Sequence, residues 1–161
     1  MKNSRYYIAY GSNLSVGQMA RRCPDAEIVG TAVLAGWQLL FKGCATIEPN
    51  ADRTTPVLIW RISPRDEERL DTYEGWPDLY FKKDLEVAVT PINGGEPLAV
   101  TAMVYIMDER HVCHAPSRFY YEVLDAGYRR FGFDRSLLRQ ALEDSVGAAE
   151  ARLFLEREVM A

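Results

Sequence analysis

The sequence has little of what marks disulfide-rich, metal-binding or membrane proteins. Its 161 residues include three cysteines and two histidines. Cys23, Cys44 and Cys113 are odd in number and irregularly spaced, which argues against a disulfide framework and fits free thiols in a reducing compartment. No apolar run approaches the ~20 residues that span a bilayer, and the first strand pattern begins without an apolar secretory segment before it. We therefore expect a cytoplasmic protein with no membrane partner.

The chain also lacks a strong excess of charge. It has 19 Lys and Arg residues against 23 Asp and Glu residues, a formal net charge of -4, and the basic residues are scattered. Nucleic-acid-binding domains carry a concentrated basic surface, so we expect no nucleic-acid partner. Hydrophobic residues make up 48% and charged residues 26%, as in ordinary globular proteins. At this length a single domain, residues 1–161, can bury a sizeable core.

Strand patterns come first along the chain and helical patterns dominate its end. We expect strands at residues 5–9, 27–41 (with bends at Gly30 and Gly36), 45–47, 57–62, 80–90 and 98–107. Helices are expected at residues 15–22, from Ser63-Pro64 to Gly75, at 116–131 and over a last region at 134–159. The polar segment 49–56, with a proline at each end, is predicted to be an exposed loop. Because several strands follow one another directly, the pattern favours an α+β protein with a mixed or antiparallel sheet.

The stretch Tyr10-Gly11-Ser12-Asn13-Leu14 lies between the first expected strand and the first expected helix. A strand that stops at a glycine and continues through a polar turn into a helix leaves several backbone N–H groups unpaired and pointing the same way. Such a turn suits a carboxylate or a phosphate. It lacks the lysine of a P-loop and the repeated glycines of a dinucleotide fingerprint, so a small carboxylate is the better candidate. A plain structural turn is the alternative.

Glu74 stands at the end of the expected helix that Gly75 closes. The C-terminal end of a helix is electronegative, so a carboxylate is electrostatically unfavourable there. One interpretation is a solvent-exposed glutamate beside a glycine stop. The other is that the helix end and the aromatic neighbours Tyr73, Trp76 and Tyr80 remove water from Glu74 and raise its pKa, which would make it a proton shuttle near neutral pH.

Two further segments carry reactive side chains. Tyr120 shares an apolar helical face, so it is either a core tyrosine or one whose hydroxyl enters a pocket. The segment His111-Val112-Cys113-His114 holds two imidazoles and a thiol, but no second ligand pair has metal-site spacing, so we expect a polar loop and no metal. Ser12 and Ser117 have no His–Asp partner pattern and no nucleophile elbow, so no hydrolytic triad is expected.

Taken together, these segments resemble the γ-glutamylcyclotransferase family, with its AIG2-like members. The resemblance covers most of the chain in order and is weakest after about Phe133. It runs through Tyr10-Gly11-Ser12-Asn13-Leu14, Ala45-Thr46-Ile47, the strand with Trp60, Leu70-Asp71 to Glu74-Gly75, Tyr80, Tyr105-Ile106-Met107, Pro116-Ser117, Tyr120 and Gly127.

The resemblance implies a mixed, mostly antiparallel sheet curled into a small barrel and flanked by short helices, with no metal and no organic cofactor. It implies that Glu74 is the acid–base residue and that Tyr80 and Tyr120 line the pocket. The implied substrate is a small γ-glutamyl amide whose own α-amine closes the 5-oxoproline ring, so no enzyme nucleophile is needed. The residues implied to hold that substrate through the turn are Tyr10, Gly11, Ser12, Asn13 and Leu14.

Other expectations concern substrate choice and assembly. Some relatives have leucine in place of Asn13, so Asn13 favours γ-glutamyl amino acids as substrates. Residues 49–56 and 108–115 are expected to shape the leaving-group pocket, and the protein is expected to be a monomer or a homodimer. Two alternative functions use the same residues: a non-catalytic module that binds a small carboxylate or a peptide end, and a cyclotransferase that removes a γ-glutamyl protecting group in biosynthesis.

Overall fold

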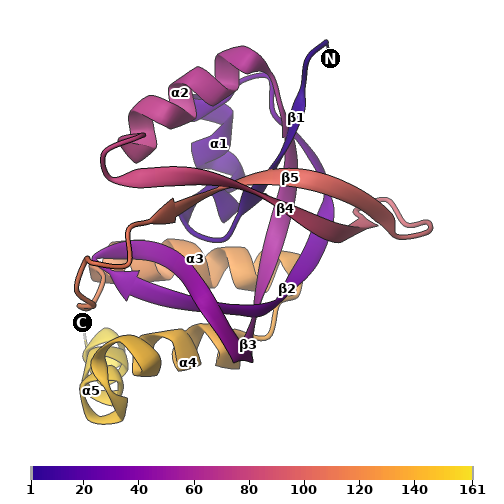
Figure 1. Ribbon diagram of the computed structural model, residues 1–161. Coiled ribbons are helices and arrows are strands. Elements are labelled where there is room, and N and C mark those ends of the chain that lie inside the picture. The colour runs from indigo at the N-terminus through magenta and orange to yellow at the C-terminus, as the bar shows by residue number, and fades with distance from the viewer. Residues whose placement is uncertain (1, 161) are drawn as a thin grey trace.

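Five strands of residues 2–160, the part of the chain that the structure describes, close into a barrel (Figure 1). They are β1 (Arg5–Ala9), β2 (Glu27–Lys42), β3 (Cys44–Ile62), β4 (Tyr80–Pro91) and β5 (Leu98–Met107). In this computed structural model the order around the barrel is β1-β3-β2-β4-β5. Neighbouring strands are antiparallel except β1 and β5, which pair in parallel and close the barrel. The predicted α+β fold, a mixed and mostly antiparallel sheet curled into a small barrel, is confirmed.

Short helices flank the barrel on two sides (Figure 1). They are the 3-10 helix η1 (Ser12–Leu14), α1 (Val16–Arg22), α2 (Pro64–Glu74), α3 (Arg118–Phe131), α4 (Arg135–Val146) and α5 (Ala148–Met160). The first pair, α1 and α2, lies together on the side of the N-terminus, whereas α3, α4 and α5 lie on the opposite side. None of the helices in the described part of the chain combines the length and apolar character needed to cross a bilayer.

The ends of α2 are fixed by side chains that the sequence identifies. The Ser63 hydroxyl accepts a hydrogen bond from the backbone N–H of Asp66 at 3.1 Å, and the Asp66 carboxylate accepts one from the N–H of Ser63 at 3.2 Å. This reciprocal capping box satisfies two N–H groups of the first turn. At the other end Gly75 adopts a left-handed φ of 67°, which a glycine tolerates without strain. Glu74 is therefore held as the last residue of α2.

The predicted loop at residues 49–56 is wrong. β3 continues through this segment, and both of its prolines lie opposite residues of β2. Within it, residues 50–53 bulge opposite the single residue Gly36, whose φ of 80° permits the bend. Both prolines lie outside this bulge, where β3 pairs with β2 alone, and proline is tolerated in a strand at such an edge position. The register also shifts beside Gly30, so both predicted bends are confirmed.

The helical region predicted at residues 134–159 is two helices. Gly147 separates α4 from α5 with a φ of 90° and a ψ of 156°, far from helical values. The first of the two helices is tied to the barrel: the hydroxyl of Ser145 accepts a hydrogen bond from the backbone N–H of Phe41 at 2.8 Å, and Asp144 pairs with Arg53 at 2.8 Å.

The core of the barrel reaches up to the turn that follows β1. Leu58, Ile59 and Val104 are fully buried, and because Leu58 and Ile59 are consecutive in β3 they point to opposite faces of the barrel wall. The indole N–H of Trp60 donates to the backbone carbonyl of Asn13 at 3.0 Å and so fixes the turn on β3. Of the cysteines, Cys23 is buried, and all three are free thiols.

Candidate active site

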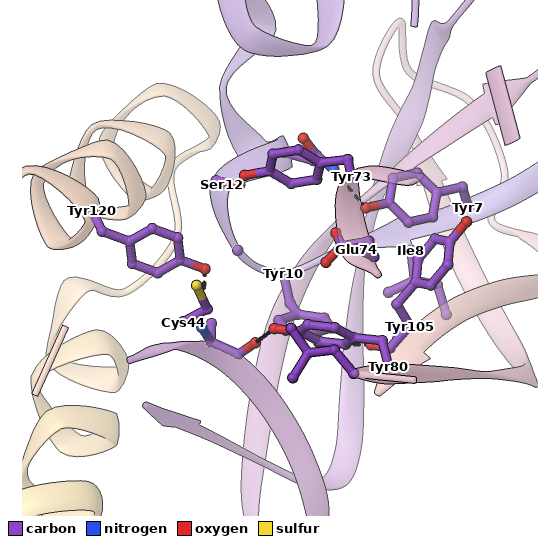
Figure 2. Close-up of a pocket in the computed structure, with 14 residues that line it drawn as sticks. Tyr7, Ile8, Tyr10, Ser12, Cys44, Tyr73, Glu74, Tyr80, Tyr105 and Tyr120 are labelled. Carbon is purple, nitrogen blue, oxygen red and sulfur yellow. Dashed lines mark hydrogen bonds between the residues drawn. The ribbon is translucent and has the colours of Figure 1, made fainter. Parts of the chain in front are cut away.

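A cavity of about 180 Å³ lies where β1 leads into η1 (Figure 2). Its lining comes from β1, η1, β3, α2, β4, β5 and α3. All the predicted site residues except Leu14 line it, namely Glu74, Tyr10, Gly11, Ser12, Asn13, Tyr80 and Tyr120. Neither residues 49–56 nor residues 108–115, which were predicted to shape the leaving-group pocket, contribute to the lining found.

Leu14 is the predicted site residue that lies elsewhere. Its side chain is fully buried, and a Cβ built on Gly127 of α3 would lie only 2.7 Å from the Leu14 Cβ. Its backbone N–H donates to the carbonyl of Gly11 at 3.0 Å and closes the 3-10 turn, so it is not available to an anion. Leu14 anchors the turn against α3, because the glycine opposite leaves room for it.

The remaining N–H groups of the turn are those of residues 11–13, all of which line the cavity. The first N–H groups of a helical turn have no acceptor within that turn. Gly11 has no space for a side chain, because a Cβ there would lie 2.9 Å from the hydroxyl oxygen of Tyr120. The strand, turn and helix predicted from the sequence are present, and the role of this turn as an anion seat stays a prediction.

Arg22, which the sequence did not single out, organises the side chains of the turn. Its Nη1 donates to the Asn13 Oδ1 at 2.6 Å and to the Ser12 hydroxyl at 3.2 Å. Its guanidinium lies over the ring of Tyr73, 3.6 Å from the centroid. The amide nitrogen of Asn13 then donates to the hydroxyl of Tyr7 at 2.9 Å. The Asn13 side chain is therefore committed to protein partners on both sides.

Glu74 turns its carboxyl into the cavity (Figure 2). Among the described residues none hydrogen-bonds to this carboxyl or forms an ion pair with it. Burial raises the pKa of Glu74 from 4.5 to about 7, and the charge of Arg22 opposes this rise only in part. The interpretation as a solvent-exposed helix-end residue is therefore wrong.

The aromatic neighbours predicted for Glu74 separate into two groups. Tyr73 and Tyr80 line the cavity with it. Trp76 does not: its side chain is 44% exposed, and its ring lies 4.3 Å from the ammonium of Lys82. The prediction for Trp76 is wrong because the chain turns outward after Gly75.

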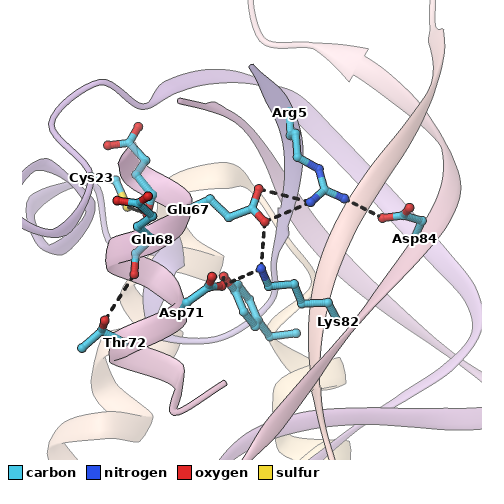
Figure 3. Close-up of polar contacts among 10 residues, drawn as sticks. Arg5, Cys23, Glu67, Glu68, Asp71, Thr72, Lys82 and Asp84 are labelled. Carbon is cyan, nitrogen blue, oxygen red and sulfur yellow. Dashed lines mark hydrogen bonds and ion pairs between the residues drawn. The ribbon is translucent and has the colours of Figure 1, made fainter. Parts of the chain in front are cut away.

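A network of charges holds α2 against the barrel (Figure 3). Lys82 on β4 places its Nζ 2.7 Å from Asp71 and 2.8 Å from Glu67, both on α2. Arg5 on β1 pairs with Glu67 at 3.0 Å, and the hydroxyl of Tyr105 on β5 donates to Asp71 at 2.6 Å. Three strands thus fix the helix that carries Glu74.

Ala45 joins two of the predicted tyrosines through its backbone. Its N–H donates to the hydroxyl oxygen of Tyr120 at 3.0 Å, and its carbonyl accepts from the hydroxyl of Tyr80 at 2.8 Å. A third hydroxyl, that of Tyr10, donates to the carbonyl of Tyr105 at 2.6 Å. These bonds hold the rings rigidly around the cavity.

The lining also includes residues to which the sequence analysis gave no role in the site: Tyr7, Ile8, Cys44, Ala45, Leu79 and Tyr105. The alternation along β1 gives a signal for Tyr7, because period-two spacing puts it on the face opposite Tyr6. Cys44 has no such signal. Burial and the nearby charge of Glu74 raise the pKa of its thiol, so the protonated form is favoured.

The loop with His111, Cys113 and His114 lies outside the cavity, against the turn between β2 and β3. The backbone of His114 donates to the carbonyl of Phe41 at 3.1 Å and accepts from the N–H of Gly43 at 3.3 Å. Within the described residues no group of three His, Cys, Asp or Glu side chains is arranged to hold a metal ion.

Solved structures of other proteins share this fold. A protein described as "Gamma-glutamyl cyclotransferase" is 22% identical with a TM-score of 0.74, and the match covers 96% of this chain and 99% of that one. An uncharacterized protein from Homo sapiens is 23% identical with a TM-score of 0.74, covering 87% of each chain. An AIG2-like protein from Mus musculus is 19% identical with a TM-score of 0.54, covering 73% of this chain and 83% of that one. A search of curated proteins found no match to the sequence.

The sequence profile of one family spans most of the barrel and the cavity. The profile described as "Gamma-glutamyl cyclotransferase, AIG2-like" matches residues 7–125. This range begins at Tyr7, includes Glu74 and ends within α3, so it contains every residue that lines the cavity. The chain therefore belongs to the gamma-glutamyl cyclotransferase, AIG2-like family.

Proposed function

We propose that the protein releases 5-oxoproline and an amine or amino acid from a γ-glutamyl amide, through attack of the substrate's own α-amine on its γ-carbonyl carbon. One observation carries this proposal. The carboxyl of Glu74 lies in the same cavity as the turn at residues 11–13, without a protein partner and with a pKa of about 7. A carboxyl of this kind both accepts and donates protons near neutral pH.

The chemistry needs one proton carrier and a bent substrate. Glu74 takes a proton from the substrate's α-ammonium group, and the free amine forms a bond to the γ-carbonyl carbon. The carbonyl then re-forms as the bond from that carbon to the leaving nitrogen breaks, and Glu74 returns the proton to this nitrogen. The ring nitrogen gives up its second proton through Glu74 in the same way, so the lactam is neutral and the amine leaves as an ammonium ion. Holding the bent conformer contributes up to roughly 7–11 kcal/mol of barrier reduction. Positioned proton transfer contributes about 10²–10⁴-fold in rate.

The turn supplies the complementary half of the site. Its N–H groups at residues 11–13 suit the α-carboxylate of the substrate or the oxyanion that develops on the γ-carbonyl. A cavity of about 180 Å³ is smaller than the roughly 300–1,000 Å³ typical of drug-sized ligands, so it suits a γ-glutamyl group. The leaving group then extends through the mouth, where Leu79 is 40% exposed.

The position of Glu74 argues against a module that only binds a carboxylate. In a module that only binds a carboxylate, the Glu74 carboxylate would weaken binding through like-charge repulsion. In an enzyme the same group is useful because it moves a proton. A biosynthetic cyclotransferase that removes a γ-glutamyl protecting group uses the same chemistry and differs in the leaving group alone.

A substrate panel tests the proposal. The protein is mixed with γ-glutamyl dipeptides and γ-glutamylamines, and 5-oxoproline is quantified by mass spectrometry. Matched analogues with an acetylated α-amine serve as the control, because they bind similarly but have no nucleophile to cyclise. We expect lactam from at least one free amine substrate and none from its acetylated analogue. Thermal stabilisation by these compounds with no lactam from any of them would instead identify a binding module.

A further inference from the structure

Three of the tyrosine hydroxyls that line the cavity have already committed their single proton. Tyr10 donates to the carbonyl of Tyr105 at 2.6 Å, and Tyr80 donates to the carbonyl of Ala45 at 2.8 Å. Tyr105 donates to the carboxylate of Asp71 at 2.6 Å. A carbonyl or carboxylate oxygen accepts only, so the direction of each bond is fixed. None of these three hydroxyls is free to donate into the cavity.

Tyr7 differs from these three because its hydroxyl is the acceptor in its bond with Asn13. The hydroxyl of Tyr120 is also an acceptor, from the N–H of Ala45, but it lies beside Cys44 and away from Glu74 (Figure 2). The guanidinium of Arg22 has only donors, so the Asn13 side chain must present its oxygen to Arg22 and its NH₂ group to Tyr7. The orientation of the Asn13 side-chain amide is therefore fixed by the donors of Arg22. Arg22 is itself held in place by the Ser12 hydroxyl and the ring of Tyr73. The proton of the Tyr7 hydroxyl therefore takes no part in the bond with Asn13 and can be donated to another acceptor.

The hydroxyl of Tyr7 faces the carboxyl of Glu74 across the cavity (Figure 2). The Tyr7 side chain is buried, and within the described part of the chain no acceptor lies in hydrogen-bond reach of its proton. The Glu74 carboxyl likewise has no donor. A buried hydroxyl whose proton has no acceptor thus faces a half-buried carboxyl that has no protein donor, and a hydrogen bond left unmade between such groups is costly.

We propose that the Tyr7 hydroxyl is the hydrogen-bond donor to the ionised Glu74 carboxylate, directly or across one water, and that Arg22 and Asn13 orient it for this task. The inference rests on the proposed function for its consequence in catalysis. Tyr7 is a positioning residue, because it stabilises the ionised form of Glu74, which accepts the substrate's proton. The side chain of Asn13 in turn holds the Tyr7 hydroxyl in place.

The other groups around Glu74 do not obscure the effect of Tyr7 on the pKa of Glu74. Within residues 2–157, Arg22 is the cation whose charge acts on Glu74. The ionisable groups that line the cavity around it from other elements are Tyr7, Tyr10, Cys44, Tyr80, Tyr105 and Tyr120, with Tyr73 on the same helix. Burial raises the pKa of each of the six groups on other elements, so these six are neutral at pH 7. A hydrogen bond to the charged form of Glu74 lowers its pKa, and removal of that bond raises it.

The test is the titration of Glu74 by carboxyl ¹³C NMR in the wild type and in Tyr7→Phe. Tyr6→Phe is the matched control, since it removes the hydroxyl from the next residue of the same strand, which contacts Arg61 outside the cavity. We expect Tyr7→Phe to move the Glu74 midpoint upward by about one pH unit, the size of one hydrogen bond to a charged group. Tyr6→Phe is expected to leave it unchanged. An unchanged midpoint in Tyr7→Phe overturns the inference.

A second measurement uses the wild-type protein and so does not depend on the folding of a variant. The ¹³Cζ shift of Tyr7 should follow the same midpoint as Glu74, and a Tyr7 signal that is constant through that titration overturns the inference. In the rate of lactam release we expect kcat/KM of Tyr7→Phe to fall about tenfold below pH 6 and to approach the wild-type value above pH 8. The NMR titrations need no substrate. Absence of lactam would therefore refute the proposed function, whereas the inference about Tyr7 is judged by the titrations alone.

Discussion

At Glu74 the fold keeps a carboxyl where it reduces stability at neutral pH. Burial raises the pKa of this group from 4.5 to about 7, and the charge of Arg22 offsets this rise only in part. The folded protein therefore binds the Glu74 proton more tightly than the unfolded chain does. This contribution to stability is complete below about pH 4.5 and is lost as the pH rises through 7. Such a cost is typical of residues kept for function.

Replacement of Glu74 by glutamine should stabilise the protein in a pH-dependent manner. We expect Glu74→Gln to match the wild type at pH 4 and to exceed its free energy of unfolding by up to about 3 kcal/mol at pH 8. Denaturant unfolding at both pH values measures this difference. Glu68→Gln, an exposed change on the same helix, is the control and should show no such trend. Equal stability of Glu74→Gln and wild type at pH 8 would show that the carboxyl is well solvated.

Gly11 gives a second prediction at the scale of one residue. An alanine Cβ would lie 2.9 Å from the hydroxyl of Tyr120, which is held by the N–H of Ala45. We expect Gly11→Ala to displace this hydroxyl and to lower kcat/KM for lactam release by about tenfold or more, since small misplacements are costly in catalysis. Gly17→Ala is the matched control: nothing lies within 4 Å of its Cβ, and in α1 it should keep activity and add roughly 0.5–1 kcal/mol of stability. Equal activity of the two variants would remove Gly11 from the site.

At the scale of elements, the site depends on how α2 is held. The capping box at Ser63 and the left-handed Gly75 fix its two ends, and both were predictable because they are local signals. The charge network from Lys82, Arg5 and Tyr105 that fixes its side was not predictable. These residues come from strands far apart in the sequence, and only barrel closure brings them together.

Loss of Lys82 should loosen this helix. In Lys82→Met the partly buried carboxylates of Asp71 and Glu67 lose their shared cation, and we expect a destabilisation of about 1–3 kcal/mol. Because α2 then moves, kcat should fall more than KM changes. Urea unfolding and steady-state kinetics measure the two effects. The control is Arg110→Met, whose side chain is 90% exposed and which should change neither quantity. If kcat were retained while stability fell, the network would serve the fold alone.

The errors of prediction at this scale have two physical causes. The prolines of residues 49–56 are turn signals locally, yet both pair with residues of β2 in the long β2–β3 hairpin, on either side of the bulge opposite Gly36. The pattern at residues 134–159 is helical throughout, but Gly147 breaks it into two helices. Leu14 was predicted to bind the substrate because it belongs to the turn sequence, but its side chain packs against Gly127 of α3 instead. In the first and third cases a tertiary contact overrides a local preference, whereas Gly147 is itself a local signal that ends a helix.

At the scale of the whole molecule, the barrel collects the site from seven elements. The prediction of one domain over residues 1–161 stays a proposal, and the contacts of α4 support it. This helix lies beyond the range that the family profile matches, yet Asp144 accepts hydrogen bonds from Gln38 at 2.9 Å and from Arg53 at 2.8 Å. The helical end of the chain is therefore attached to the same hairpin that carries Ala45.

If the chain is one domain, unfolding of the site and of the helices should coincide. In a Trp37→Phe/Trp76→Phe background the fluorescence of Trp60, which lies under the turn at Asn13, reports on the site. Circular dichroism at the helix band reports on the helices. We expect the two urea midpoints to agree, as for a two-state domain. Separate transitions would mean that the C-terminal helices form a unit of their own.

The central claim is that Glu74 moves the proton during lactam formation, and the turnover of Glu74→Gln tests it most directly. Glutamine keeps the shape of the side chain but neither accepts nor donates a proton at neutral pH. With the best substrate of the panel, we expect Glu74→Gln to bind with affinity similar to the wild type while its rate of 5-oxoproline release at pH 7.5 falls by about 10²–10⁴-fold. A rate within a few-fold of the wild type would contradict the account.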